Sequence, residues 1–409
     1  MIKRTLFSEV QLSIHSKPVT LITGARQVGK STVALEFMNQ GFSYVSLDNS
    51  RERELARTDS ALFLQLHPWP CIIDEIQYAP QLFDAIEETV NKEKVKRADN
   101  YGMYIITGSQ MFRLMNGVSQ SMAGRVHIIH MPPLSRNEIL GREEPVFSFD
   151  IPLISQRANQ NPLSVEGLFS DIVHGYYPEL YSNPLLKVET FYSDYVETYL
   201  ERDVTDILQI KDRFAFLHFM ELMASLTGEE LIMDNISKVI GIDNKTAKNW
   251  LSILLASDIV YLLEPYNESS ITKRIVKRPK IYFSDTGLAC YLAKVNSPKT
   301  LQASFLSGHF VETYIVNAIR KTYLNNGRNP NFFYYRDSNQ NEIDLIILED
   351  GQLHCVECKT GMSFDKKSVK AFSQISNTKY HIGTGLIVCN TDSVYPVDKD
   401  IFAVPIAGI

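Results

Sequence analysis

Apolar and polar positions alternate in short blocks over residues 18–135. Five blocks are mostly apolar and rich in β-branched or aromatic residues: Pro18–Thr23, Phe42–Leu47, Cys71–Asp74, Met103–Thr107 and Val126–Met131. Strands that are buried on both faces of a parallel sheet show this pattern. Because helical stretches separate the blocks, the sequence predicts a doubly wound α/β domain with a parallel sheet over residues 1–140.

The pattern changes after this first domain. Polar, turn-forming runs at Gly141–Pro145 and Asn159–Pro162 predict a linker over residues 141–165. Residues 166–300 predict a second, mainly helical domain that ends in a polar hairpin at residues 262–283.

From about residue 301 the pattern is that of one helix followed by strands, which predicts a third domain, of α/β class, over residues 301–409. The turn-forming run Glu349-Asp350-Gly351 joins two of the strands. The predicted strands are Phe332–Tyr335, Ile343–Leu348, Leu353–Cys358, Gly385–Cys389 and Ile401–Ile406.

Composition narrows the class of protein. The chain has 409 residues, of which 44% are hydrophobic, so several domains can each bury a core and disorder over most of the chain is excluded. A net charge of −6 excludes a uniformly basic coat for nucleic acid but leaves a local basic patch open. Five cysteines, no apolar run behind the N-terminal cations and no apolar window of about 18 residues predict a cytoplasmic protein without a membrane partner.

A phosphate-binding loop lies between the first predicted strand and a helix. Residues 24–32 match the pattern G-x-x-x-x-G-K-[ST] at every fixed position. Glycines let backbone N–H groups surround phosphates at the positive end of a helix, Lys30 reaches the β- and γ-phosphates, and the Ser31 hydroxyl ligates Mg²⁺. We therefore predict that ATP with Mg²⁺ binds to Gly24, Ala25, Arg26, Gln27, Val28, Gly29, Lys30, Ser31 and Thr32, with Arg26 also open to a packing role.

Two carboxylates follow another buried strand, Cys71–Asp74. In such a position Asp74 would hold the Mg²⁺ with its water shell, and Glu75 would polarise the attacking water as general base. Two acids in a surface turn are the plainer interpretation, but beside a phosphate-binding loop the pair predicts hydrolysis of ATP rather than binding alone.

Three further residues are candidates for the catalytic set. Ser109 or Gln110, directly after the strand Met103–Thr107, would lie between the loop and the acidic pair and could sense the γ-phosphate, or cap a turn. Arg125 is a candidate arginine finger, acting in cis or on a neighbouring subunit, and the second case would require an oligomer. Arginines before strands are also common without such a role.

The second domain contains the pattern of a helix-turn-helix with a following wing. One helix is predicted at Leu231–Ile240 and another at Asn244–Ala256, with a glycine turn between them. DNA contact through residues 244–280 would use the phosphate backbone. The candidate contacts are Lys245, Thr246 and Lys248 on the helix and Lys273, Arg274, Lys277, Arg278 and Lys280 on the wing. A lid that packs on the first domain, with a solvated charge run, stays open.

The third domain contains an acid, then acid-x-lysine, on neighbouring strands. Metal-dependent nucleases of the restriction-endonuclease type build a site in this way. Asp344 and Glu357 would hold Mg²⁺ or Mn²⁺, Lys359 would orient water, and Glu312 would add a ligand from the preceding helix. Since the pattern is short, a salt-bridged relic of a nuclease fold is the competing interpretation.

Taken together, the motifs resemble a prokaryotic family of AAA-type P-loop ATPases with a C-terminal domain of unknown function similar to restriction endonucleases. The resemblance covers nearly the whole chain and departs at His174–Pro178, where relatives tend to have two glycines. It rests on Gly24–Lys30, Ile73–Gln77, Thr107–Gln110, Ser121–Arg125, Tyr199–Asp203, Pro279–Gly287, Tyr335–Arg336, Glu342–Asp344 and Val356–Lys359.

The function expected from this resemblance and from the motifs is that of a Mg-dependent ATPase. Its nucleotide state would be coupled to engagement of DNA or another partner by the rear domains. An ATP-gated metal-dependent nuclease and a signalling or scaffold ATPase that binds proteins are the two alternatives.

Overall fold

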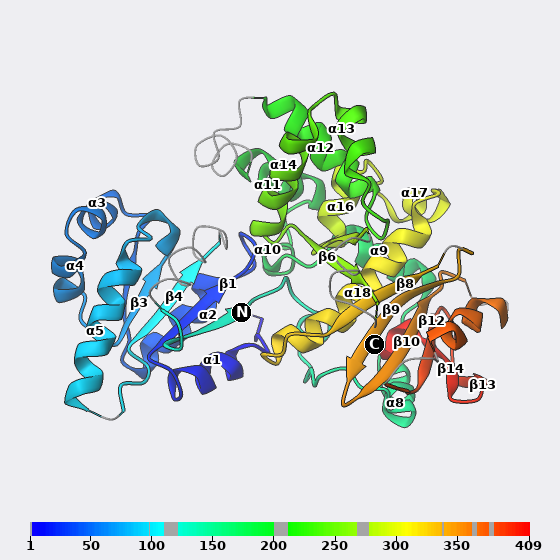
Figure 1. Cartoon of the computed structure of the whole chain (residues 1–409), viewed down its shortest axis with the longest axis horizontal. Helices are drawn as coiled ribbons and strands as arrows, with labels where there is room; N and C mark the ends of the chain where they lie inside the picture. Colours follow the sequence, from blue (N-terminus) through cyan, green and yellow to red (C-terminus); the bar gives the residue numbers. More distant parts are fainter. Residues whose placement is uncertain are drawn as a thin grey trace.

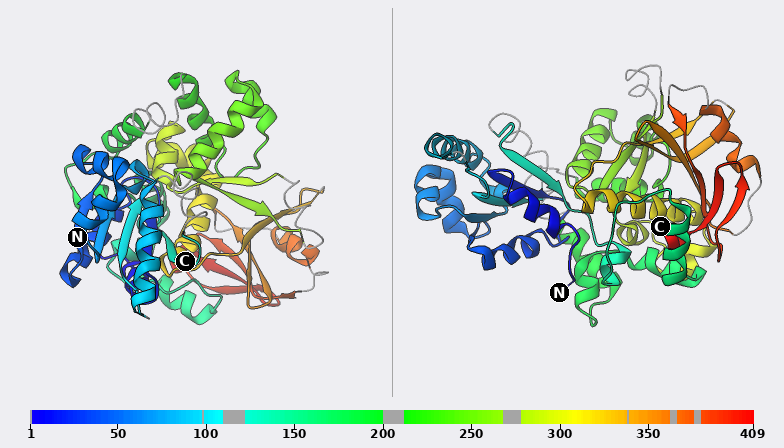
Figure 2. Two further views of the ribbon diagram at one scale, coloured as in Figure 1. Left: turned by 60° about the vertical axis from the view of Figure 1, so that its left-hand side comes forward. Right: turned by 90° about the horizontal axis from the view of Figure 1, so that it is seen from below.

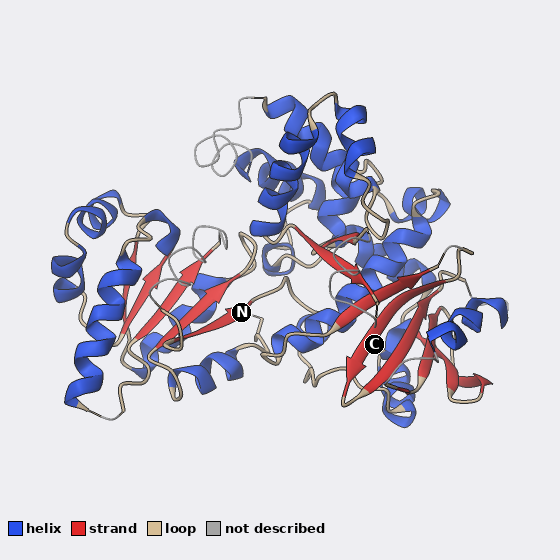
Figure 3. Cartoon of the chain, viewed as in Figure 1, coloured by secondary structure: helices blue, strands red, loops and turns tan. Residues whose placement is uncertain are grey.

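A computed structural model describes residues 2–97, 99–109, 122–199, 212–267, 278–337, 339–361, 366–375 and 380–409. Two sheets dominate it, one on each side of the view in Figure 1, and Figure 3 separates them from the helices by colour. The helices of the middle of the chain gather above the second sheet in that view, and the views of Figure 2 show the same division into two lobes.

The N-terminal sheet is parallel throughout and has the strand order β2-β3-β4-β1-β5. Its strands confirm the prediction to within one residue at each end. They are β1 (Val19–Thr23), β2 (Ser43–Ser46), β3 (Cys71–Asp74), β4 (Tyr104–Gly108) and β5 (Val126–His130). The helical elements around it are α1 (Phe7–Ile14), α2 (Lys30–Leu35), η1 (Glu36–Gln40), α3 (Ser50–Thr58), α4 (Ser60–Leu66), η2 (Ile76–Tyr78) and α5 (Leu82–Lys96).

Alternate residues of the central strands enter different cores. Ile72 and Ile105 belong to one buried cluster, whereas their neighbours Ile73 and Ile106 belong to another on the opposite face. This two-sided burial explains why the strands are continuous apolar runs rather than alternating ones. It also leaves the carboxyl edge of the sheet as the place where polar side chains gather.

The stretch that we expected to be a linker is partly helical. It contains α8 (Ile151–Gln160), and the short helix α7 (Arg136–Ile139) lies just before it. The Asp150 side chain caps α8 by accepting a hydrogen bond from the N–H of Leu153, and Ile154 is fully buried beside the C-terminal element η5 (Ile406–Gly408). Of the polar runs that suggested a linker, one lies in the loop before α8 and the other spans the C-terminal end of α8.

The middle of the chain is helical, as expected. The two helices predicted around the glycine turn are α13 (Met233–Ile240) and α14 (Asn244–Ala256), with Gly241 at φ 80° and Asp243 as the cap of α14. The other elements are α9 (Val165–His174), α10 (Pro178–Ser182), α11 (Val188–Tyr199), α12 (Arg213–Ser225), β6 (Val260–Pro265), β7 (Lys280–Phe283), α16 (Thr286–Leu292) and α17 (Pro298–Ala303).

The second sheet has nine strands in the described part of the chain and crosses the predicted boundary at residue 300. Its path is β13-β14-β12-β10-β9-β8-β6-β7, with β11 beside β10. Since β6 pairs with β8, the hairpin β6–β7 of the middle segment extends the C-terminal sheet. The C-terminal elements are α18 (Ser307–Asn325), β8 (Phe332–Arg336), β9 (Glu342–Glu349), β10 (Gln352–Cys358), η4 (Lys366–Ile375), β11 (His381–Ile382), β12 (Gly385–Cys389), β13 (Tyr395–Asp398) and β14 (Ile401–Pro405).

Among the described residues, no helix combines the length and apolar character that crossing a membrane requires.

Candidate functional site

The phosphate-binding loop leaves β1 at the carboxyl edge of the parallel sheet and enters α2 at Lys30. Gly24 has φ 146°, and a Cβ atom there would lie 2.2 Å from the carbonyl oxygen of Met131. Gly29 has φ 97° directly before the helix. Both positions therefore require glycine, for close approach at Gly24 and for the left-handed conformation at Gly29.

The Lys30 ammonium is turned back into its own loop. Its Nζ lies 3.1 Å from the Gly24 carbonyl oxygen and 2.6 Å from that of Ala25, and the residue is 5% exposed. Burial lowers the pKa of Lys30 to about 8. A cation bonded to carbonyls at the positive end of a helix is best stabilised by an incoming anion such as a phosphate.

Asp74 lies directly beside the loop, at the end of β3. Its Oδ1 accepts a hydrogen bond from the Ser31 hydroxyl at 2.8 Å and a short one from Thr107, and its Oδ2 accepts one from Tyr44 at 3.0 Å. Ser31 and Asp74 are oxygen donors next to the phosphate-binding loop, and this set fits Mg²⁺ bound with a nucleotide.

Tyr44 was not predicted from the sequence as part of this site. Burial, together with the Asp74 carboxylate, raises the pKa of the Tyr44 hydroxyl to about 12, so the hydroxyl stays a hydrogen-bond donor. Nothing in the local pattern around Tyr44 marks it, because only the pairing of β2 with β3 brings it to Asp74.

Glu75 follows in a left-handed conformation, φ 60°. Its N–H donates to Thr107 Oγ1 at 3.2 Å, and its carboxylate accepts a short hydrogen bond from Gln77. Gln77 also donates to the Ser109 hydroxyl at 3.2 Å. Burial raises the pKa of Glu75, while the Lys30 charge and the Gln77 hydrogen bond oppose the shift. A partly buried carboxylate beside the phosphate-binding lysine has the environment expected of a general base.

Lys30, Ser31 and Glu75 line a cavity of about 640 Å³, a volume within the usual range for ligand sites. Arg26, Ser31 and Glu75 line it from the N-terminal domain, and Pro178 of α10 and Tyr195 of α11 close it from the middle segment. The candidate nucleotide site is therefore built by two parts of the chain that the sequence placed in separate domains.

One of the predicted catalytic residues lies far from this cavity. Arg125 precedes β5 at the amino edge of the sheet, the edge opposite the loop, where it donates to Asn91 at 2.8 Å and pairs with Glu87 at 3.3 Å. This placement is a correction to a role for Arg125 in cis, because strand direction separates it from the phosphates. Another candidate, Gln110, lies outside the described residues.

Acids predicted for a C-terminal metal site do come together. Antiparallel β9 and β10 place Asp344 beside Glu357, and Lys359 Nζ lies 2.6 Å from Glu357 Oε1. Burial and the charge of Asp344 raise the pKa of Glu357 to about 8. Burial and the charge of Glu312 raise the pKa of Asp344 to about 7. Glu312 of α18 joins the same cluster, where it accepts hydrogen bonds from Lys280 and Tyr282 at 2.8 and 2.6 Å.

Lys280 is the principal correction to the sequence analysis. It was expected on a basic wing, in contact with DNA, but it is 2% exposed and its Nζ faces carboxylates. Lys245 and Lys248 of α14 and Arg278 are exposed as expected. The wing cations Lys273, Arg274 and Lys277 lie outside the described residues.

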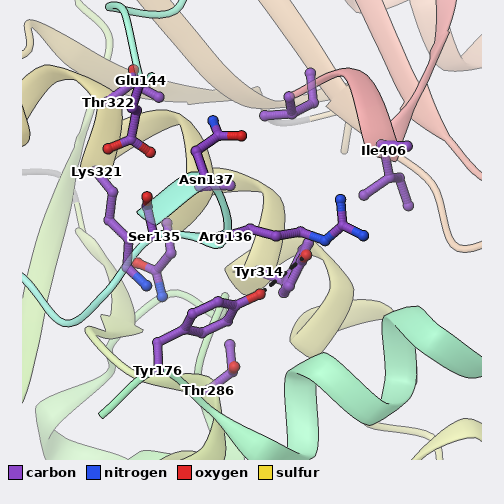
Figure 4. Close-up of a pocket in the computed structure, with 14 residues that line it drawn as sticks. Ser135, Arg136, Asn137, Glu144, Tyr176, Thr286, Tyr314, Lys321, Thr322 and Ile406 are labelled. Carbon is purple, nitrogen blue, oxygen red and sulfur yellow. Dashed lines mark hydrogen bonds between the residues drawn. The ribbon is translucent and has the colours of Figure 1, made fainter. Parts of the chain in front are cut away.

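A second set of buried charges, also absent from the sequence analysis, joins α18 to the end of the N-terminal domain. Lys321 donates to the Leu134 carbonyl at 2.8 Å, and its Nζ lies 4.1 Å from the centre of the Tyr176 ring. Figure 4 shows these side chains around a small cavity, with the Tyr176 hydroxyl bonded to that of Tyr314 at 3.2 Å. With about 30 Å³ of free space, the cavity has room for about one or two water molecules and not for a nucleotide.

Comparison with protein families divides the chain into three matches. Residues 16–140 match the model of an AAA domain. Residues 166–299 match a domain of unknown function, DUF8612, and residues 307–409 match another, DUF4143. The N-terminal part of this chain is thus similar to AAA domains.

Two mycobacterial relatives and several solved structures are similar to larger parts of the chain. The uncharacterized proteins Rv2008c of Mycobacterium tuberculosis and Mb2031c of Mycobacterium bovis are each 22% identical over 404 residues, which is 98% of this chain and 83% of theirs. The Walker-type ATPase PABY2304 of Pyrococcus abyssi is 14% identical, with 71% of this chain and 96% of that chain covered and a TM-score of 0.44. A point variant of RuvB from Thermotoga maritima is 11% identical, with 63% of this chain and 88% of that chain covered and a TM-score of 0.30.

Proposed function

We propose that this chain binds ATP with Mg²⁺ and hydrolyses it, and that the state of the nucleotide is transmitted to the middle and C-terminal parts. The observation that carries the proposal is the bond of 2.8 Å between the Ser31 hydroxyl and Asp74, next to a buried Lys30 whose ammonium is bonded to two carbonyls. Loop, metal donors and lysine thereby meet at the edge of one sheet.

Each residue then has a distinct task. Bound Mg²⁺ supplies charge neutralisation to the β- and γ-phosphates, and Ser31 and Asp74 would hold it. Lys30 exchanges its two carbonyl partners for phosphate oxygens. Glu75 accepts a proton from the attacking water. The Gln77 amide nitrogen, which also donates to the Ser109 hydroxyl, fixes the orientation of the Glu75 carboxylate.

The transmission of the nucleotide state would use contacts that leave the nucleotide cavity. Gly175 at φ 71° starts a loop in which the N–H of Tyr176 donates to Asp285 at 2.7 Å and Pro178 reaches the nucleotide cavity. Arg4 connects the loop carbonyl of Val28, at 2.7 Å, to Glu138, at 3.1 Å. A change at the phosphates can therefore shift elements well beyond the loop.

A further contact between side chains crosses from the sheet to the middle segment. His130 at the end of β5 lies 2.9 Å from Asp258, which follows α14 and is 6% exposed. Burial alone would raise the pKa of Asp258, but His130 and Arg320 hold it below its usual value. Because α14 carries the exposed Lys245 and Lys248, this pair connects the nucleotide domain to the candidate DNA-contacting helix.

The test is turnover of Mg-ATP by the purified full-length chain, with and without double-stranded DNA, alongside Glu75→Gln. Turnover that is lost in Glu75→Gln supports the ATPase proposal, and stimulation by DNA supports DNA as the partner. A matched variant, Lys245→Gln with Lys248→Gln, should then lose the stimulation and keep basal turnover. Turnover that DNA does not change would favour the alternative in which the rear domains bind a protein partner.

A further inference from the structure

The carboxylates of the C-terminal site surround a side chain that the sequence placed elsewhere. Lys280 Nζ lies 2.8 Å from Glu312 Oε1, 2.6 Å from Glu342 Oε1 and 3.8 Å from Asp344 Oδ1. These acids come from α18 and β9, whereas Lys280 comes from β7. One ammonium group therefore lies where carboxylates from two separate elements converge.

The charges of this cluster are close to balanced by the chain itself. Four acids, Glu312, Glu342, Asp344 and Glu357, lie beside three cations, Lys280, Lys359 and Arg336, the last at 3.9 Å from Glu342. Burial opposes the charge on Lys280, but Glu312, Asp344 and Glu342 raise its pKa well above the usual value. A divalent cation would have to enter a site whose negative charge is already mostly neutralised, so it gains little from these acids.

The backbone of Lys280 is held on both sides, so the ammonium cannot easily leave. β7 pairs with β6 through Lys280 and Leu263, and Glu230 forms a bridge to Lys280 on its other side. Tyr282, two residues along the same strand, donates its hydroxyl to Glu312 at 2.6 Å. Departure of the lysine would leave Glu312 and Glu342 buried or half-buried without their main cation, which is costly.

The arrangement of the acidic residues also speaks against a divalent metal in this cluster. Within the described ranges, no group of three or more His, Cys, Asp or Glu side chains is arranged to hold a metal ion. One oxygen of Glu357, Oε2, is buried without a hydrogen-bond partner and is open to a ligand, but Lys359 holds the other and the N–H of Cys358 donates to Asp344 Oδ2 at 2.8 Å. The residues present thus do not fit the divalent metal of a restriction-endonuclease-type nuclease.

We propose that Lys280 is the resident cation of the C-terminal carboxylate cluster, and that it excludes divalent metal from the cluster and fastens β7 to the C-terminal sheet. The cluster is then an internal ion network rather than a hydrolytic centre. It joins the hairpin β6–β7, which follows α13 and α14, to the C-terminal strands. This connection does not depend on whether a nucleotide is bound.

Binding of Mn²⁺ to the full-length, nucleotide-free chain tests this proposal, with free Mn²⁺ measured by its electron paramagnetic resonance signal. Wild type and Asp344→Asn should bind equal amounts of Mn²⁺, because the metal does not reach Asp344. Asp350→Asn, an exposed carboxylate in the β9–β10 turn, is the matched control for the loss of one negative charge. Any Mn²⁺ at the nucleotide site is common to all three proteins and cancels.

Removal of the ammonium should then open the cluster. Lys280→Gln is expected to bind one additional Mn²⁺ per chain, and Lys280→Gln with Asp344→Asn is expected to lose it again. The proposal is overturned if wild type binds an Mn²⁺ that Asp344→Asn loses and Asp350→Asn keeps. A folded Lys280→Gln protein with no additional Mn²⁺ would overturn it as well. If Lys280→Gln does not fold, the comparison of wild type with Asp344→Asn still decides.

Discussion

The candidate nucleotide site and the C-terminal cluster both combine a lysine with acidic residues, but their lysines have different partners. Lys30 is bonded to two backbone carbonyls, and Asp74 is satisfied by hydroxyl groups of Ser31, Tyr44 and Thr107. Lys280, in contrast, has carboxylates as its partners. In the candidate nucleotide site the lysine and Asp74 are bonded to different groups. In the C-terminal cluster the lysine and the acids are bonded to each other.

This difference decides what each region can bind. A lysine on carbonyls at a helix N-terminus has a pKa lowered by burial and gains from an anion. A lysine among acids has a pKa raised by them and needs no further ligand. The presence of lysine and acids in a motif is therefore a weaker indication of a working site than the identity of the lysine's partners.

The largest expected effect is on the rate of ATP turnover, which should depend on Glu75 and not on the C-terminal cluster. Glu75→Gln should lower the rate of ATP turnover by about 100- to 10,000-fold, since a general base contributes on this scale. Asp344→Asn should leave turnover within about twofold of wild type, because the C-terminal cluster takes no part in it. A steady-state phosphate-release assay measures both, and retained binding of a fluorescent ATP analogue by Glu75→Gln is the control. Comparable losses in the two variants would contradict the division.

The free energy of unfolding, in contrast, should depend more on the C-terminal cluster than on the candidate nucleotide site. Glu312→Ala removes one partner of a buried ammonium and the acceptor of the Tyr282 hydroxyl, and should cost about 3–5 kcal/mol of unfolding free energy. Lys30→Ala removes bonds to two carbonyls and should cost about 1 kcal/mol or less. Urea unfolding followed by circular dichroism measures both. Equal destabilisation by the two variants would mean that Lys30, too, is held mainly for structure.

The candidate nucleotide site was largely predictable because its motifs are local. Gly24–Thr32 and Asp74–Glu75 each follow an apolar strand, and parallel strands bring their carboxyl ends to one edge. Tyr44 and Arg4 escaped prediction because their contacts, with Asp74 and with the Val28 carbonyl, depend on pairing and packing between distant segments. The same rule speaks against a cis role for Arg125, because a residue that precedes a strand of a parallel sheet lies at the edge opposite the carboxyl ends.

The C-terminal cluster shows the opposite case. Asp344 and Glu357 were predicted to meet, and the antiparallel pairing of β9 and β10 brings them together. Lys280 was assigned to an exposed wing because it lies in a run of cations, and in such a run the sequence cannot distinguish the one that is buried. The parallel pairing of β6 with β8 decides it, and this pairing has no local sequence signal.

A smaller effect is expected from the residue that orients Glu75. Gln77 is 1% exposed and donates to both Glu75 and Ser109. Gln77→Ala should lower kcat about tenfold with KM nearly unchanged, since misorientation weakens proton transfer without removing contacts to the nucleotide. Steady-state kinetics gives both constants. A rise in KM without a fall in kcat would assign Gln77 to nucleotide binding instead.

The smallest effect concerns the rim of the C-terminal cluster, where His309 lies 2.9 Å from Glu229 one turn before Glu312 on α18. The hydrogen bond to Glu229 raises the pKa of His309 and lowers that of Glu229, while Glu312 adds to the rise and Lys280 opposes it. The stabilisation by protonated His309 is complete below its unfolded pKa of about 6.5 and disappears as the pH rises through its higher folded pKa. The stabilisation by the Glu229 carboxylate disappears in acid, below about pH 4. Because the pair is partly exposed, it should contribute about 0.2–1 kcal/mol at most. His309→Gln should therefore lower the melting temperature more at pH 5.5 than at pH 8. An equal loss of melting temperature at both pH values would show that His309 stabilises the protein by packing and not by its charge.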